Sequence, residues 1–104
     1  TQKALRLAID LRQESARLDR ALKDLEKQRQ NLHEEQKRIR ENLQAMGDRP
    51  GEKELRGRYL KTLNSQEDKL EQIDKDARKH IDARDDARDK MNSILAKLEY
   101  DAEL

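Results

Sequence analysis

Several residue types on which other folds depend are missing from this chain of 104 residues. It contains no cysteine, phenylalanine, tryptophan or valine, and aromatic residues make up only 2%. The lack of cysteine excludes disulfides and thiol chemistry. No apolar run approaches the roughly 20 residues of a membrane-spanning helix, so we expect no membrane insertion. A globular domain with a bulky core is not expected either, because such domains are typically near half apolar.

Glycine and proline are rare, and their positions predict a turn. All three glycines and the only proline lie in ENLQAMGDRPGEKELRGRYL, residues 41–60. Gly47 suits the left-handed conformation that ends a helix, and Pro50 suits the first turn of the next one. Asp48 is a candidate N-cap for that second helix. The predicted turn covers residues 47–51 and consists mainly of Gly47, Asp48, Pro50 and Gly51.

Charged residues are abundant instead, at 45% of the chain. The 24 basic and 23 acidic residues are interleaved and leave a net charge of +1. No basic face stands out, so nucleic acid is not an expected partner. A composition of this kind fits either disorder or a long helix with one narrow apolar stripe. The periodicity of the apolar residues decides between the two.

A seven-residue repeat runs through the first half of the chain. Its two series of core positions are Ala4, Leu11, Leu18, Leu25, Leu32, Ile39, Met46 and Ala8, Ser15, Leu22, Arg29, Gln36, Leu43. Such a repeat is typical of the a and d positions of a coiled coil. It predicts a helix over residues 2–46.

The repeat resumes beyond the turn. Its series are Leu63, Leu70, Ala77, Arg84, Met91, Leu98 and Tyr59, Gln66, Ile73, His80, Ala87, Ile94. These positions predict a second helix over residues 51–102. The phase of the repeat stays open over residues 77–84, where Ile81 lies off the stripe. We interpret Ser15, Arg29 and Arg84 as tolerated core residues, with the arginine charges in water.

The short turn predicts an all-α fold, a long antiparallel two-helix coiled-coil hairpin that forms one domain over residues 1–104. The residue numbers of facing core positions then have a constant sum. A sum of 102 places Gln36 against Gln66, where the two amides could satisfy each other. This pair either fixes the register or is a tolerated defect. The same register pairs Asp19 with Arg88, and we prefer it to one that is a heptad tighter, with a sum of 95.

Apolar residues also lie outside the stripe at the end away from the turn, which we call the open end. They are Leu5, Leu7, Ile9, Leu95 and Leu104, together with Tyr100. One opposing helix cannot cover so many faces. We predict an interaction surface that is covered either by the rest of a parent protein or by a second copy, as a homo-oligomer with a four-helix bundle. Scattered exposed leucines are the alternative.

No residues in the sequence form a pattern typical of catalysis or metal binding. His33 opens HEEQK, but the second histidine of a helical zinc motif is absent. In the preferred register His33 and His80 lie about 16 Å apart along the helix axis, at about 1.5 Å per residue. We therefore predict no catalytic residue, no metal, no cofactor and no small-molecule substrate.

Three stretches carry a resemblance to a known family. They are RIRENL (38–43), RYLKTL (58–63) and QEDKLE (66–71). Across residues 34–73 the chain resembles the coiled-coil part of a bacterial family of unknown function related to mucoidy inhibitor A. That resemblance implies a bacterial parent, associated with the envelope or located in the cytoplasm, with β-rich domains attached to the hairpin. It supplies no catalytic residues.

The sequence thus predicts a structural and interaction module rather than an enzyme. In this interpretation the hairpin is a spacer or oligomerisation element of a larger bacterial protein. The start at Thr1 without a methionine suggests a processed product or an excised piece. The alternative is a helical adaptor that binds a partner helix along a groove from Ala77 to Ala87.

Overall fold

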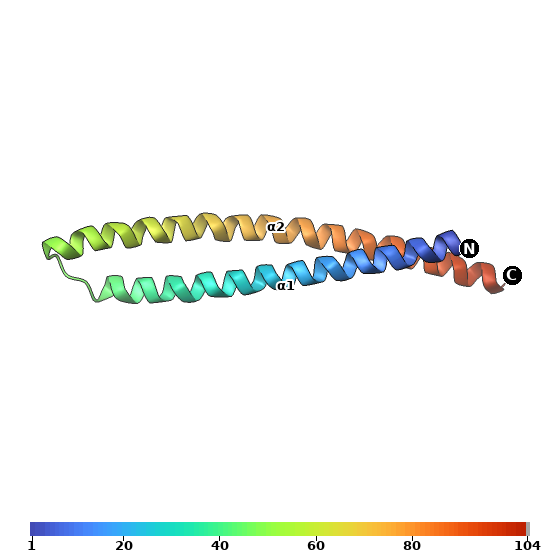
Figure 1. Cartoon of the computed structure of the whole chain (residues 1–104), viewed down its shortest axis with the longest axis horizontal. Coiled ribbons are helices and arrows are strands. Elements are labelled where there is room, and N and C mark those ends of the chain that lie inside the picture. Colours follow the sequence, from blue (N-terminus) through green and yellow to red (C-terminus); the bar gives the residue numbers. More distant parts are fainter. Residues whose placement is uncertain (104) are drawn as a thin grey trace. The chain divides into compact units, whose positions relative to one another are not determined.

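The computed structural model describes residues 1–103 and consists of two helices joined by a loop (Figure 1). Helix α1 spans Gln2–Gln44 and helix α2 spans Pro50–Glu103. The described residues contain no β-strand. The fold is therefore the predicted all-α helical hairpin, with α1 ending two residues earlier and α2 starting one residue earlier than the sequence pattern suggested.

The chain forms two compact units, which we describe separately. The loop-end unit is Leu25–Lys75, and the open-end unit comprises residues 1–24 together with residues 76–103. In each unit a segment of α1 packs against an antiparallel segment of α2. Both chain termini belong to the open-end unit (Figure 1).

The predicted core positions form the buried stripe of both units. Every position of the two series, from Ala4 to Met46 and from Tyr59 to Leu98, is buried or half-buried. The buried apolar members are Ala8, Leu18, Ile39, Leu70, Ile73 and Ala87. His80 and Arg84 are half-buried while Ile81 is exposed, so the repeat keeps its phase over residues 77–84.

Polar contacts between the helices define the register in each unit. In the open-end unit Arg88 contacts Ser15 and Arg84 contacts Asp19, and in both pairs the residue numbers add to 103. In the loop-end unit Arg29 contacts Asp74 and Gln36 contacts Glu67, with the same sum. Residue n of α1 therefore lies level with residue 103 − n of α2. The contacts agree with the predicted sum of 102 to within one position and exclude the tighter register.

The loop has a different local structure from the one predicted. No glycine has a positive φ, so the expected left-handed end at Gly47 is wrong. Instead the Gly47 N–H donates to Glu52 Oε2 at 2.8 Å, and a Cβ on Gly47 would lie 3.1 Å from that oxygen. A side chain at this position would require the flexible end of Glu52 to move by a few tenths of an ångström.

The residue that caps the start of α2 also differs from the predicted one. Pro50 occupies the first helical position, as predicted, and Gly51 follows it inside the helix. The N-cap is therefore Arg49, whose carbonyl accepts from the N–H groups of Glu52 and Lys53. Asp48 lies one position too early to cap the helix, and its carboxylate instead pairs with Arg56 at 3.4 Å.

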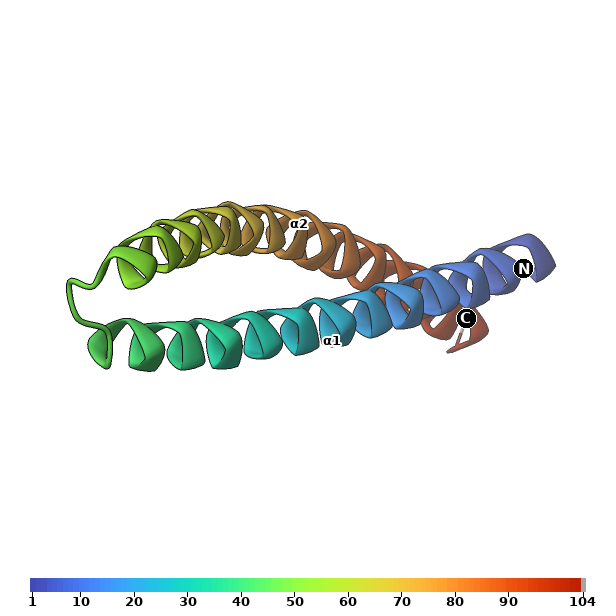
Figure 2. The ribbon, with the colours of Figure 1, turned by 60° about the vertical axis from the view of Figure 1, so that its left-hand side comes forward.

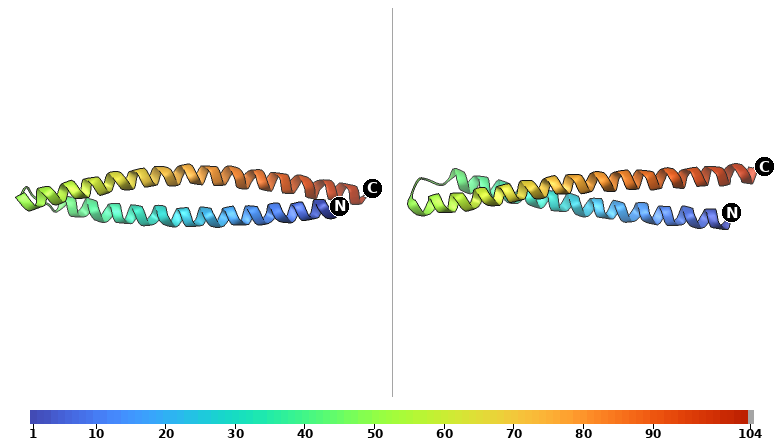
Figure 3. Two further views of the ribbon diagram at one scale, coloured as in Figure 1. Left: turned by 45° about the horizontal axis from the view of Figure 1, so that its top comes forward. Right: turned by 90° about the horizontal axis from the view of Figure 1, so that it is seen from above.

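The first turns of α2 extend beyond the end of α1 within the loop-end unit (Figures 1 and 3). In the observed register Gln44 is level with Tyr59, so the nine residues Pro50–Arg58 have no α1 segment opposite them. Residues 45–49 span this offset as non-helical chain (Figure 2). Arg56 holds them in place by donating to the Gly47 carbonyl at 2.8 Å.

Candidate functional site

Exposed large apolar side chains are concentrated in the open-end unit. Six of the eight on the described chain belong to it, namely Leu5, Leu7, Ile9, Ile81, Leu95 and Tyr100. The loop-end unit, which is of similar length, exposes only Leu55 and Leu60. A two-helix stripe covers one face of each helix, so side chains on the remaining faces stay in solvent unless another structure covers them.

Part of this surface is hollowed into a groove between the helices. One hollow is lined by Leu7, Leu11, Ser93 and Ile94, with Asp89 and Lys90 at its edge. An adjoining hollow shares Ile94 and is lined by Ala4 and Leu98, with Thr1, Lys97 and Asp101 around it. We call the two together the open-end groove. Its floor is apolar, and its rim carries charges of both signs.

The predicted interaction residues lie on different parts of the open-end unit. Leu7 lines the groove, whereas Leu5, Ile9 and Leu95 are exposed but do not line either hollow. Leu5 and Leu7 are two residues apart, which turns their side chains by about 200° around the helix. The buried stripe runs between them, so they lie on opposite flanks. Tyr100 is also exposed and lines neither hollow, and the remaining predicted residue, Leu104, lies outside the described residues.

Four groove residues, Ala4, Leu11, Ile94 and Leu98, were assigned by the sequence only to the core. All four are half-buried and line the groove. The small residues Ala4 and Ala8 at this end of the stripe were the signal available in the sequence.

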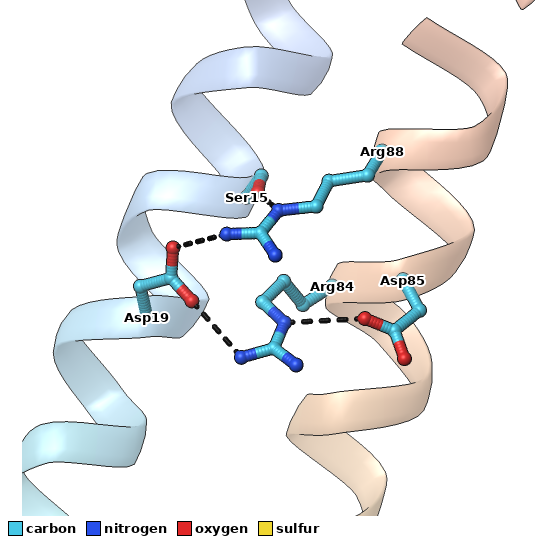
Figure 4. Close-up of polar contacts among 5 residues, drawn as sticks. All are labelled: Ser15, Asp19, Arg84, Asp85 and Arg88. Carbon is cyan, nitrogen blue, oxygen red and sulfur yellow. Dashed lines mark hydrogen bonds and ion pairs between the residues drawn. The ribbon is translucent and has the colours of Figure 1, made fainter. Parts of the chain in front are cut away.

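A cluster of polar side chains connects the two helices of the open-end unit (Figure 4). Asp19 of α1 accepts from Arg88 at 2.8 Å and from Arg84 at 3.2 Å. Arg88 also donates to the buried hydroxyl of Ser15 at 3.1 Å, and Arg84 donates to Asp85 at 3.2 Å. The predicted contact between Asp19 and Arg88 is therefore present.

The interpretation of Arg84 and Arg29 as arginines with charges in water needs correction. The Arg84 side chain is only 23% exposed, and its hydrogen bond to Asp19 raises the pKa of the guanidinium above its ordinary value. In the loop-end unit Arg29 donates to Asp74 at 2.6 Å and to Glu26 at 3.0 Å. Both arginines lay their methylenes on the stripe and pair their charges across the helices, so they are part of the helix contact.

The glutamine layer of the loop-end unit is buried, but its two amides do not pair with each other. Gln36 and Gln66 are 1% and 4% exposed, and the Oε1 atoms of both lack a hydrogen-bond donor. The Gln36 amide nitrogen donates instead to Glu67 at 3.0 Å. The expected mutual hydrogen bond is therefore wrong, because the flank carboxylate competes for the donor. Each orphaned oxygen costs roughly 1–3 kcal/mol.

The described part of the chain contains no candidate metal site. Across residues 1–103 no three acidic or histidine side chains come close enough to hold a metal ion. His33 is exposed, and His80 lies on the half-buried stripe. No helix over the same residues is long and apolar enough to cross a bilayer. The open-end groove is the strongest candidate for a functional site.

Comparisons with known proteins do not assign this chain to a family. No family model, no curated protein and no solved structure matches it.

Proposed function

We propose that the chain is a structural interaction module, a helical hairpin that holds a larger assembly together through its open-end unit. The observation that carries this proposal is the uneven distribution of exposed apolar side chains, six in the open-end unit and two in the loop-end unit. A large apolar side chain contributes about 1.5–3 kcal/mol when fully buried, so a few of them suffice for a specific contact.

The parent that we propose is a bacterial protein of the family related to mucoidy inhibitor A. In such a parent the open-end unit would contact the neighbouring domains, and the loop-end unit would act as the spacer. The resemblance over residues 34–73 supports this idea. Catalysis, nucleic acid and a small-molecule substrate are not part of the proposal.

The adaptor alternative gains no support from the burial of its residues. Ala87 is 5% exposed and Ala77 is half-buried, and both lie on the stripe of core positions. A partner helix along these alanines would have to displace the chain's own helix. We therefore favour the open-end unit as the interaction surface.

Site-specific photo-crosslinking tests the proposal in the cell that produces the protein. A benzophenone amino acid at Leu7 or Leu95 is expected to form adducts, which mass spectrometry assigns to a second copy, to a distant part of the same polypeptide or to another protein. The matched control is Leu60 of the loop-end unit, which is 49% exposed against 51% for Leu7. Adducts at Leu60 as abundant as those at Leu7 would contradict the proposal.

A further inference from the structure

We propose that the open-end groove is occupied by a second copy of this chain, related to the first by a two-fold axis perpendicular to the helices. This inference rests on the proposed function and names its partner. The two copies would place α1 on the partner's α1 and α2 on the partner's α2, in each case antiparallel. A closed dimer of this kind buries the same surface on both copies.

Two of the four charged residues on the rim, Lys90 and Asp101, are self-complementary under this symmetry. Lys90 and Asp101 lie on α2 at opposite ends of the groove. They are 11 residues apart, which is about 16 Å along a helix. A two-fold axis midway between them, at the level of Leu95 and Ala96, brings Lys90 of each copy onto Asp101 of the other. The symmetry repeats this contact, so the dimer contains two such ion pairs.

The apolar floor is self-complementary about the same axis. Ala4 and Leu11 lie on α1 and line the two adjoining hollows. Their midpoint is between Leu7 and Ala8, and in the observed register this point is level with the midpoint of Lys90 and Asp101. The axis that pairs the charges therefore also places the large Leu11 of one copy on the small Ala4 of the other.

Leu7 has a distinctive position in this dimer. It lies beside the axis, so its side chain contacts the Leu7 of the partner. The flank with Leu5 and Leu95 points away from the dimer and stays available to the rest of a longer chain. The groove is about 20 Å long at 1.5 Å per residue and two helices wide, which is at the small end of specific interfaces. We expect a dissociation constant on the order of 1–100 μM.

Sedimentation equilibrium of the full 104-residue chain tests the dimer, with Leu5 as a matched control. Leu5 and Leu7 are 48% and 51% exposed, so neither substitution disturbs a buried core. The wild type and Leu5→Glu are expected to dimerise with the same affinity, whereas Leu7→Glu weakens the dimer at least tenfold. Circular dichroism checks that helicity is unchanged in both variants. A monomeric wild type, or equal weakening by the two variants, would overturn the inference.

A charge exchange tests the two-fold geometry. Lys90→Asp and Asp101→Lys each put like charges together and should each weaken the dimer severalfold. The double variant restores opposite charges across the interface and should recover most of the affinity. Lys90 also pairs with Asp86 in its own helix at 2.9 Å, so thermal melts must show that the variants remain folded. A double variant no better than the single ones would overturn this arrangement of the copies.

A cysteine pair gives an independent measurement of the axis. Leu7→Cys is expected to form a disulfide-linked dimer under mild oxidation, and Leu5→Cys is not. Equal dimer yields from the two variants would contradict the proposed axis. A monomeric chain in sedimentation combined with photo-adducts to another polypeptide at Leu7 would remove the second copy as partner and leave the proposed function standing. An absence of adducts at the open end would remove the proposed function itself.

Discussion

The two units of this hairpin are built from the same repeat, yet they differ in where they place polar and apolar side chains. The loop-end unit has two buried glutamines at its centre and exposes two large apolar residues. The open-end unit leaves six such residues in solvent and pairs its polar side chains around Asp19.

Under the proposed function a single repeat would serve two purposes. In the loop-end unit the flanks are mainly polar, and the buried stripe contains two glutamines whose Oε1 atoms lack a donor. In the open-end unit the stripe is continued by apolar flanks, which favours contact with another surface. We expect substitutions of buried residues to affect stability in both units, and substitutions of exposed apolar side chains to affect association only in the open-end unit.

The largest expected effect comes from truncating a buried core residue. Leu18→Ala removes a side chain that is 2% exposed in the open-end unit and should cost about 2–5 kcal/mol of unfolding free energy, toward the lower end because the core is thin. Hydrogen exchange should show the loss of protection in residues 1–24 and 76–103 first. Equal loss throughout residues 25–75 would show that the two units unfold as one.

The glutamine layer should respond in the opposite direction. Gln66→Leu removes an orphaned buried oxygen and is expected to stabilise the chain by roughly 1–3 kcal/mol in urea unfolding. Gln36→Leu should stabilise it less, because this change also removes the hydrogen bond to Glu67. Since the amides do not bond to each other, the two effects should be close to additive. A strongly non-additive double variant would show that the amides do share a hydrogen bond.

The two ionic clusters allow a matched comparison of the units. Asp19→Asn removes the carboxylate shared by Arg84 and Arg88, two ion pairs at once, and should cost about 1 kcal/mol. Asp74→Asn removes only the single ion pair with Arg29 and should cost less. Thermal melts at low and high salt measure both. A larger loss of stability from Asp74→Asn than from Asp19→Asn would contradict this expectation.

The smallest expected effect is a dependence on pH within one helix. The hydrogen bond from Arg17 lowers the pKa of Glu14 below its ordinary value of 4.5. A carboxyl with a lowered folded-state pKa stabilises the fold above its unfolded pKa, and this contribution is lost as the pH falls through the folded value. Glu14→Gln should therefore melt slightly below the wild type at neutral pH and equal to it in acid. A difference that persists in acid would contradict this assignment.

Much of the fold was predictable from local chemistry. The heptad spacing identified both helices and every position of the buried stripe, because helical periodicity is a property of the chain itself. The clustering of Gly47 and Pro50 located the loop to within two residues, since the observed loop is 45–49 rather than the predicted 47–51. The preferred register followed from matching core residues, and it agrees with the observed contacts to within one position.

Contacts between side chains were decided only by the tertiary structure. The sequence placed Gln36 and Gln66 in one layer, but the position of Glu67 on the flank determined which acceptor the amide uses. It grouped Leu5 with Leu7, and only the packed helices show that one of them lines the groove. It also assigned Gly47 a left-handed backbone, whereas no glycine has a positive φ and the Gly47 N–H donates to Glu52. Periodicity specifies which face of a helix a residue occupies. A hydrogen bond depends in addition on side-chain rotamers and on axial offsets between the helices that are smaller than one residue. Both are fixed only when the two helices pack.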